Sequence, residues 1–60
     1  MQRHRIHTTD GRYLVGKEYD AVKYAVEVGV ERAEVGGETF FVVSSQTDAS
    51  GNKVTKVEKG

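Results

Sequence analysis

Residues 31–45 read ERAEVGGETFFVVSS, and this stretch decides the fold. The pair Gly36-Gly37 is a tight-turn signal, because glycine accepts the positive φ angles that two-residue hairpin turns require. The pair predicts a hairpin over about 31–45 in which Val35 lies opposite Glu38. The same register places Ala33 opposite Phe40 and Arg32 opposite Phe41.

The apolar run that follows the turn leaves two arrangements open. A continuous run such as Phe40 to Val43 is typical of a strand with both faces buried. Side chains alternate between the two faces of a strand. Either Phe40 and Val42 face a helix while Phe41 and Val43 face outward, or the reverse holds.

Upstream of this hairpin, the chain changes to a helical period. Apolar residues recur at i, i+3 and i+4 over about 17–28, which indicates one buried stripe of a helix. Gly16 precedes this helix as its cap. Gly29 is placed to end the helix in a left-handed conformation, with Val30 folding back on the last turn. The stripe consists of Tyr19, Val22, Ala25, Val26 and Gly29.

The first part of the chain predicts another hairpin, over about 3–15. Asp10-Gly11 is a two-residue turn signal, which pairs Thr9 with Arg12. Alternation then gives one apolar face, the core face, and one basic face. The core face carries His4, Ile6, Thr8, Tyr13 and Val15. The basic face carries Arg3, Arg5, His7, Thr9, Arg12 and Leu14.

The end of the chain reads as a polar loop and a last strand at about 53–59. Val54 and Val57 are out of phase on this strand, which indicates a bulge or a frayed end. No linker divides the chain, so we expect a single small domain over residues 1–60. The predicted class is α+β: a two-layer domain with an antiparallel sheet of four to five strands packed on one helix. The expected order is β-β-α-β-β, with the last strand as a fifth.

Composition limits the classes of function. A chain of 60 residues buries only about 60% of its unfolded surface, which disfavours a deep active-site pocket. His4 and His7 lie on opposite faces of one strand, so they cannot bind one metal ion together. No nucleophile motif surrounds the serines, and Gly36-Gly37 lacks the residues of a phosphate loop. We therefore expect no enzymatic activity, no cofactor, no metal site and no small-molecule substrate.

Two further absences concern the membrane. No apolar run approaches the length of about 20 residues that spans a bilayer. The first residues carry charges without the apolar stretch of a secretory signal. We therefore expect a cytoplasmic protein without membrane association.

The net charge of zero hides a segregation along the chain. Residues 1–17 hold four Lys and Arg against one Asp, whereas residues 18–38 hold six Asp and Glu against two Lys and Arg. Such an asymmetry can attract charged partners. Alternatively, the basic and acidic elements lie side by side and attract each other.

Two surfaces are candidates for contact with a partner. One is the basic hairpin face. The other is the outer sheet face with its surplus of apolar side chains, unless a fifth strand or the C-terminal tail covers it. The predicted partner-binding residues are Arg3, Arg5, His7, Arg12, Leu14, Phe41 and Val43.

These surfaces predict a small binding protein that acts by protein–protein contact, such as a regulator or inhibitor of a larger protein. The partner is either a heterologous protein or a second copy in a homodimer. The alternative is a nucleic-acid-binding module, since a basic two-stranded ribbon can enter the major groove of DNA. The neutral net charge argues against that class, because nucleic-acid-binding domains usually carry a net positive charge. No motif of the chain matches a protein family closely enough to name one.

Overall fold

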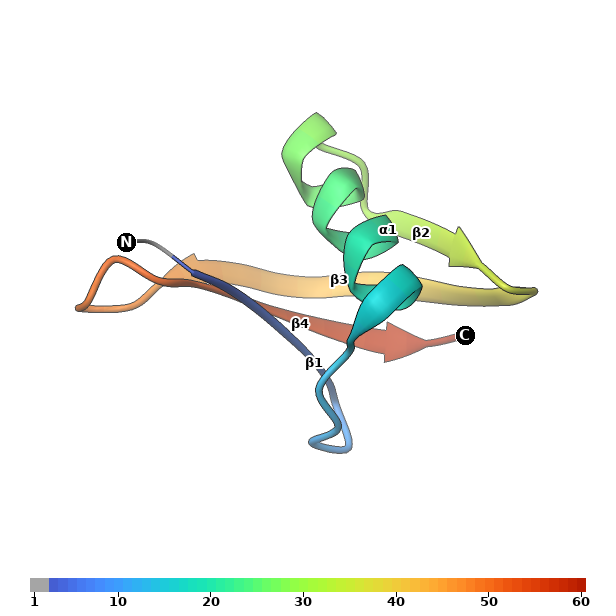
Figure 1. Ribbon diagram of the computed structural model, residues 1–60, viewed down its shortest axis with the longest axis horizontal. Helices are drawn as coiled ribbons and strands as arrows, with labels where there is room; N and C mark the ends of the chain where they lie inside the picture. Colours follow the sequence, from blue (N-terminus) through green and yellow to red (C-terminus); the bar gives the residue numbers. More distant parts are fainter. Residues whose placement is uncertain (1–2) are drawn as a thin grey trace.

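The computed structural model of the protein describes residues 3–60, so Met1 and Gln2 of the predicted domain lie outside the described residues. One helix lies against one side of a four-stranded sheet (Figure 1). No helix of the described chain is both long and apolar enough to cross a lipid bilayer. The elements are β1 (His4–Thr8), α1 (Gly16–Val28), β2 (Arg32–Val35), β3 (Glu38–Thr47) and β4 (Lys53–Lys59).

The class α+β is confirmed, but the expectation of a purely antiparallel sheet is wrong. The strand order across the sheet is β1-β4-β3-β2, and β1 runs parallel to β4. The other two pairs are antiparallel. Parallel neighbours need a long crossover connection, and here that connection consists of α1, β2 and β3. The expected order of elements is close to the observed one, with the segment after β1 as the main difference.

That segment differs because its turn is longer than the sequence signal indicates. Thr8, and not Thr9, closes the loop: the Thr8 N–H donates to the Arg12 carbonyl oxygen at 2.8 Å. Gly11 has a φ of 94°, as in a three-residue loop that ends in a left-handed residue. The register therefore shifts by one, and a one-residue shift moves every side chain to the other face. Only a single bridge, between His7 and Tyr13, remains of the predicted second strand.

The central hairpin is confirmed in the predicted register. Val35 pairs with Glu38 across the Gly36-Gly37 turn, Ala33 with Phe40, and Arg32 with Phe41.

The helix is also confirmed, with one change at its start. The residue that caps it is Val15, without a side-chain hydrogen bond, and Gly16 is already part of α1. At its end Gly29 adopts a φ of 84°, where its N–H reaches carbonyl oxygens of the last turn, and the Val30 N–H donates to the Ala25 carbonyl oxygen at 3.0 Å. This is the predicted left-handed end, a conformation that glycine adopts without penalty.

The last strand forms, and it occupies a central place in the sheet between β1 and β3. The predicted irregularity lies on its partner strand: the register between β3 and β4 shifts between Val42 and Ser44, which leaves Val43 unpaired as a bulge. Together β3 and β4 form a long hairpin that extends past the other elements (Figure 1).

The core lies between α1 and the inner face of the sheet. Phe40 has an exposed fraction of 0%, whereas its neighbour Phe41 is 45% exposed. This settles the open choice in favour of Phe40 facing the helix. The threonines Thr8 and Thr55 are also buried on this face. The buried apolar residues are Ile6, Leu14, Val22, Ala25, Ala33, Phe40 and Val57.

Candidate functional site

The outer face of the sheet, opposite α1, is not covered by a helix or strand of residues 3–60 (Figure 1). The register brings three strands together around its apolar centre. Phe41 of β3 lies between Arg32 of β2 and Glu58 of β4, its direct cross-strand neighbours. An exposed aromatic ring between two side chains of opposite charge has the character of a small contact surface, with an apolar centre and a polar rim.

One residue lies partly against this ring. The Gly60 N–H donates to the Thr39 carbonyl oxygen at 2.8 Å, which brings Gly60 beside Phe41. A Cβ atom added at Gly60 would come within 2.5 Å of the Phe41 Cε2 atom. Phe41 still keeps the exposed fraction given above, so the C-terminal residue covers only part of it. Val43 of the bulge also remains exposed.

A basic cluster lies on the same face, further along β1 and β4. Arg5 is opposite Val54, and His7 is opposite Lys56 in the parallel pair. The exposed ring of Tyr13 meets the His7 ring edge-on, with the centroids 5.8 Å apart. The Nδ1 atom of His7 is buried and has no hydrogen-bond partner among the described residues. Of the predicted basic stripe, Arg5 and His7 therefore lie together on the outer face.

The other members of that stripe lie elsewhere, because the register after the Asp10-Gly11 turn is shifted. Leu14 is a core residue with an exposed fraction of 4%, so its prediction as an exposed contact residue is wrong. Arg12 points toward α1, where its guanidinium lies 3.8 Å from the Glu18 carboxylate. Arg3 borders a groove on the helix side of the sheet.

Two carboxylates near the turn and the C-terminus are held in their charged form. The Thr8 hydroxyl, the Asp10 carboxylate and the Arg12 N–H form one hydrogen-bonded turn, and the Thr8 hydroxyl lowers the pKa of Asp10 most. The Lys59 ammonium lies 2.9 Å from the Glu38 carboxylate and lowers its pKa. The Asp10 turn closes the loop after β1, and the Lys59–Glu38 pair links the end of β4 to the start of β3.

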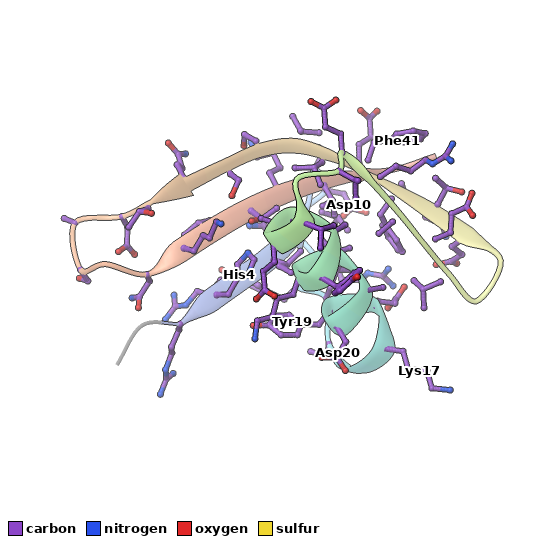
Figure 2. All side chains as sticks on the ribbon, turned by 90° about the horizontal axis from the view of Figure 1, so that it is seen from above. His4, Asp10, Lys17, Tyr19, Asp20 and Phe41 are labelled. Atoms are coloured by element: carbon purple, nitrogen blue, oxygen red, sulfur yellow. The ribbon has the colours of Figure 1, made fainter. Side chains whose placement is uncertain are left out.

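A groove of about 540 Å³ opens on the helix side, between β1, α1 and the long hairpin. Its residues come from distant parts of the chain, so no local sequence pattern predicts it. His4 and Tyr19 form one wall, where their rings meet at an angle with centroids 6.2 Å apart (Figure 2). The groove is lined by Arg3, His4, Tyr19, Lys23, Glu27, Thr47, Gly51 and Lys53.

Hydrogen bonds fix the wall of this groove. The His4 Nε2 atom and the buried Thr55 hydroxyl share a hydrogen bond of 2.7 Å, and Thr55 Oγ1 lies 3.2 Å from the Ser45 Oγ atom. The Tyr19 hydroxyl donates to the His4 carbonyl oxygen at 2.7 Å. Burial lowers the pKa of His4 below its usual value, and the nearby Lys53 lowers it further.

Comparisons of the chain with protein-family models, with curated proteins and with solved structures gave no match. Within residues 3–60, no three His, Asp or Glu side chains are placed to ligate one metal ion. Residues 3–60 present two surfaces of distinct chemistry: an outer face with an exposed aromatic centre, and a polar groove beside the helix.

Proposed function

We propose that this is a small non-enzymatic binding protein that acts by protein–protein contact through the outer face of its sheet. One observation carries the proposal: Phe41 is nearly half exposed at the centre of a sheet face that no described helix or strand covers. Phe41 and Val43 of β3 are both exposed, and contiguous exposed apolar surface marks interaction sites. A cytoplasmic regulator or inhibitor of a larger protein fits this size and this surface.

The contact surface consists of an apolar centre and charged neighbours. Phe41 supplies the aromatic side chain that interface centres favour. Arg32 and Glu58 flank it from neighbouring strands, so they can orient a partner by complementary charge. Arg5 and His7 extend the same face toward β1.

The test compares two exposed aromatic side chains on opposite sides of the molecule. The variant Phe41→Asp places a charge at the centre of the outer face, and Tyr24→Asp makes the same change on α1, where the tyrosine is 66% exposed. Both should keep the circular dichroism spectrum of the unchanged protein. A protein captured from lysate and identified by mass spectrometry should bind the purified unchanged chain and Tyr24→Asp, but not Phe41→Asp. Equal binding by both variants would contradict the outer face as the contact surface.

A second copy of the chain is one partner that the same variants test. Sedimentation over a range of concentrations should then show a dimer for the unchanged protein and for Tyr24→Asp. The variant Phe41→Asp should remain a monomer, because a charge at the centre of a symmetric contact is repeated on both copies.

Nucleic acid is the second candidate, supported by the cluster of Arg5, His7 and Lys56 beside the exposed ring of Tyr13. Basic side chains next to an aromatic ring can hold phosphates and stack a base. This function predicts affinity for a single-stranded oligonucleotide that falls steeply with salt. Arg5→Gln should weaken that affinity, whereas Lys17→Gln, at the start of α1, should not. Affinity that is flat with salt would exclude this candidate.

A further inference from the structure

The groove beside α1 gathers positive charge from three separate parts of the chain. Arg3 comes from the residue before β1, Lys23 from α1, and Lys53 from the first residue of β4. Glu27 is the one carboxylate that lines the groove. The lining therefore has an excess of positive charge in a protein whose net charge is zero.

These three cations have no carboxylate partner among the described residues. The ion pairs within 4.0 Å in residues 3–60 join Arg12 to Glu18 and Lys59 to Glu38. Lys23 and Glu27 are one helical turn apart, but with the lysine first, which is the less favourable order for a pair on a helix. The positive charge of the groove is thus left for solvent or a ligand to neutralise.

The charges also act on the histidine in the groove wall. After burial, Lys53 and Lys23 are the next causes that lower the pKa of His4, and Glu27 acts in the opposite direction. These groups belong to β4 and α1, the two elements that face His4 from either side. Lys23, Lys53 and Glu27 line the same groove as His4.

The wall itself is held in place before any ligand binds. The Tyr19 hydroxyl is bonded to the backbone of β1, and the His4 ring is bonded to buried Thr55. A wall fixed in this way loses little freedom on binding, which favours affinity. The groove volume of about 540 Å³ lies within the range of small-ligand sites.

We propose that this groove binds a small ligand that carries a phosphate group, held by Arg3, Lys23 and Lys53. Guanidinium groups bind phosphate through two parallel hydrogen bonds, and lysine ammonium groups act as point charges on the same oxygens. The His4 and Tyr19 rings form flat walls for the remainder of the ligand. The site lies on the helix side of the sheet, so it is independent of the contact surface around Phe41.

The experiment is an NMR titration of the full chain at constant ionic strength, with inorganic phosphate in one series and adenosine monophosphate in another. We expect saturable shifts of backbone amides at His4, Tyr19, Lys23 and Lys53. Tighter binding of the nucleotide would identify a phosphate ester as the preferred source, and tighter binding of inorganic phosphate would identify free phosphate. Equal binding would mean that the phosphate group alone supplies the affinity and that the two rings add none. Shifts that stay linear with concentration in both series would overturn the proposal.

Two double variants with the same loss of charge separate a site from general attraction. Lys23→Gln/Lys53→Gln removes two cations of the groove and should weaken binding on the order of tenfold, because each partly exposed pair contributes modestly. Lys17→Gln/Lys59→Gln removes two cations outside the groove, at the start of α1 and at the end of β4. Figure 2 shows Lys17 at the far end of the helix, extending into solvent. The control should change affinity by no more than about twofold, since salt screens distant charges. An equal loss in both double variants would overturn the proposal.

The histidine provides a readout that does not depend on affinity. A bound phosphate group offsets the charges of Lys23 and Lys53, so the pKa of His4 should rise when the ligand is present. The chemical shifts of the His4 imidazole against pH, with and without adenosine monophosphate, measure this change. A pKa of His4 that does not move at saturating ligand would place the ligand elsewhere and refute the site.

Discussion

The two adjacent phenylalanines of β3 should respond very differently to the same truncation. Phe40→Ala removes a ring that is fully buried beneath α1 and leaves a cavity, at a cost of about 3–5 kcal/mol. Burying a whole phenylalanine side chain contributes about 1.5–3 kcal/mol. Phe41 is 45% exposed and leaves no enclosed cavity, so Phe41→Ala should cost only about 1 kcal/mol.

The size of the domain makes this contrast easy to measure. At typical values per residue, 60 residues give a free energy of unfolding of about 3–9 kcal/mol. Phe40→Ala should therefore lose at least about a third of this free energy of unfolding, and all of it at the low end of the range, whereas Phe41→Ala should stay folded. Phe40→Leu keeps most of the side-chain volume and should cost about 1–1.5 kcal/mol, which provides a measurable value within the folded range.

Urea unfolding followed by far-UV circular dichroism and tyrosine fluorescence gives these free energies. The slope of the transition should be the same for the unchanged protein and for Phe41→Ala, because both expose the same surface on unfolding. Equal losses at the two positions, or a larger loss at Phe41, would mean that the face assigned to the helix is reversed.

Three further perturbations test the turn after β1, the end of α1 and the histidine in the groove. Leu14→Ala should lower the free energy of unfolding in urea by about 2–4 kcal/mol, whereas Val15→Ala should change it by no more than about 0.5 kcal/mol. A larger loss at Val15 than at Leu14 would support the register expected from Asp10-Gly11. Gly29→Ala should cost about 1 kcal/mol, because its φ is left-handed, and an unchanged melting temperature would contradict this. Burial lowers the pKa of His4, so the unfolded chain binds a proton that the folded protein does not. Stability should fall as the pH drops through 6.5, and His4→Gln should reduce that fall; an unaltered pH profile in this variant would exclude the histidine as its cause.

Local signals predicted the elements whose contacts are local. The Gly36-Gly37 turn fixes a hairpin, and its register follows from the turn alone. The end of α1 follows from Gly29 in the same way. The failure at Asp10-Gly11 is of a different kind, since that dipeptide suits both a two-residue and a three-residue loop. Each loop assigns the next side chains to opposite faces.

The rest of the structure depends on contacts between distant segments. The parallel pairing of β1 with β4 joins residues such as Arg5 and Val54, and no local pattern encodes it. The groove follows from that pairing, because it brings Lys53 next to His4. The Phe41 surface could be predicted only as one of two arrangements, and the position of α1 over Phe40 decides between them.

The central place of β4 in the sheet has a consequence for the order of folding. β1 is the first element along the chain and its partner strand is the last, and contacts such as that of Arg3 with Asn52 span 49 residues of chain. Closing so long a loop costs more entropy than closing the two-residue turn of the β2–β3 hairpin. α1 and the β2–β3 hairpin can therefore associate early. β1 stays without its neighbour until β4 has paired with β3, and only then can the sheet close.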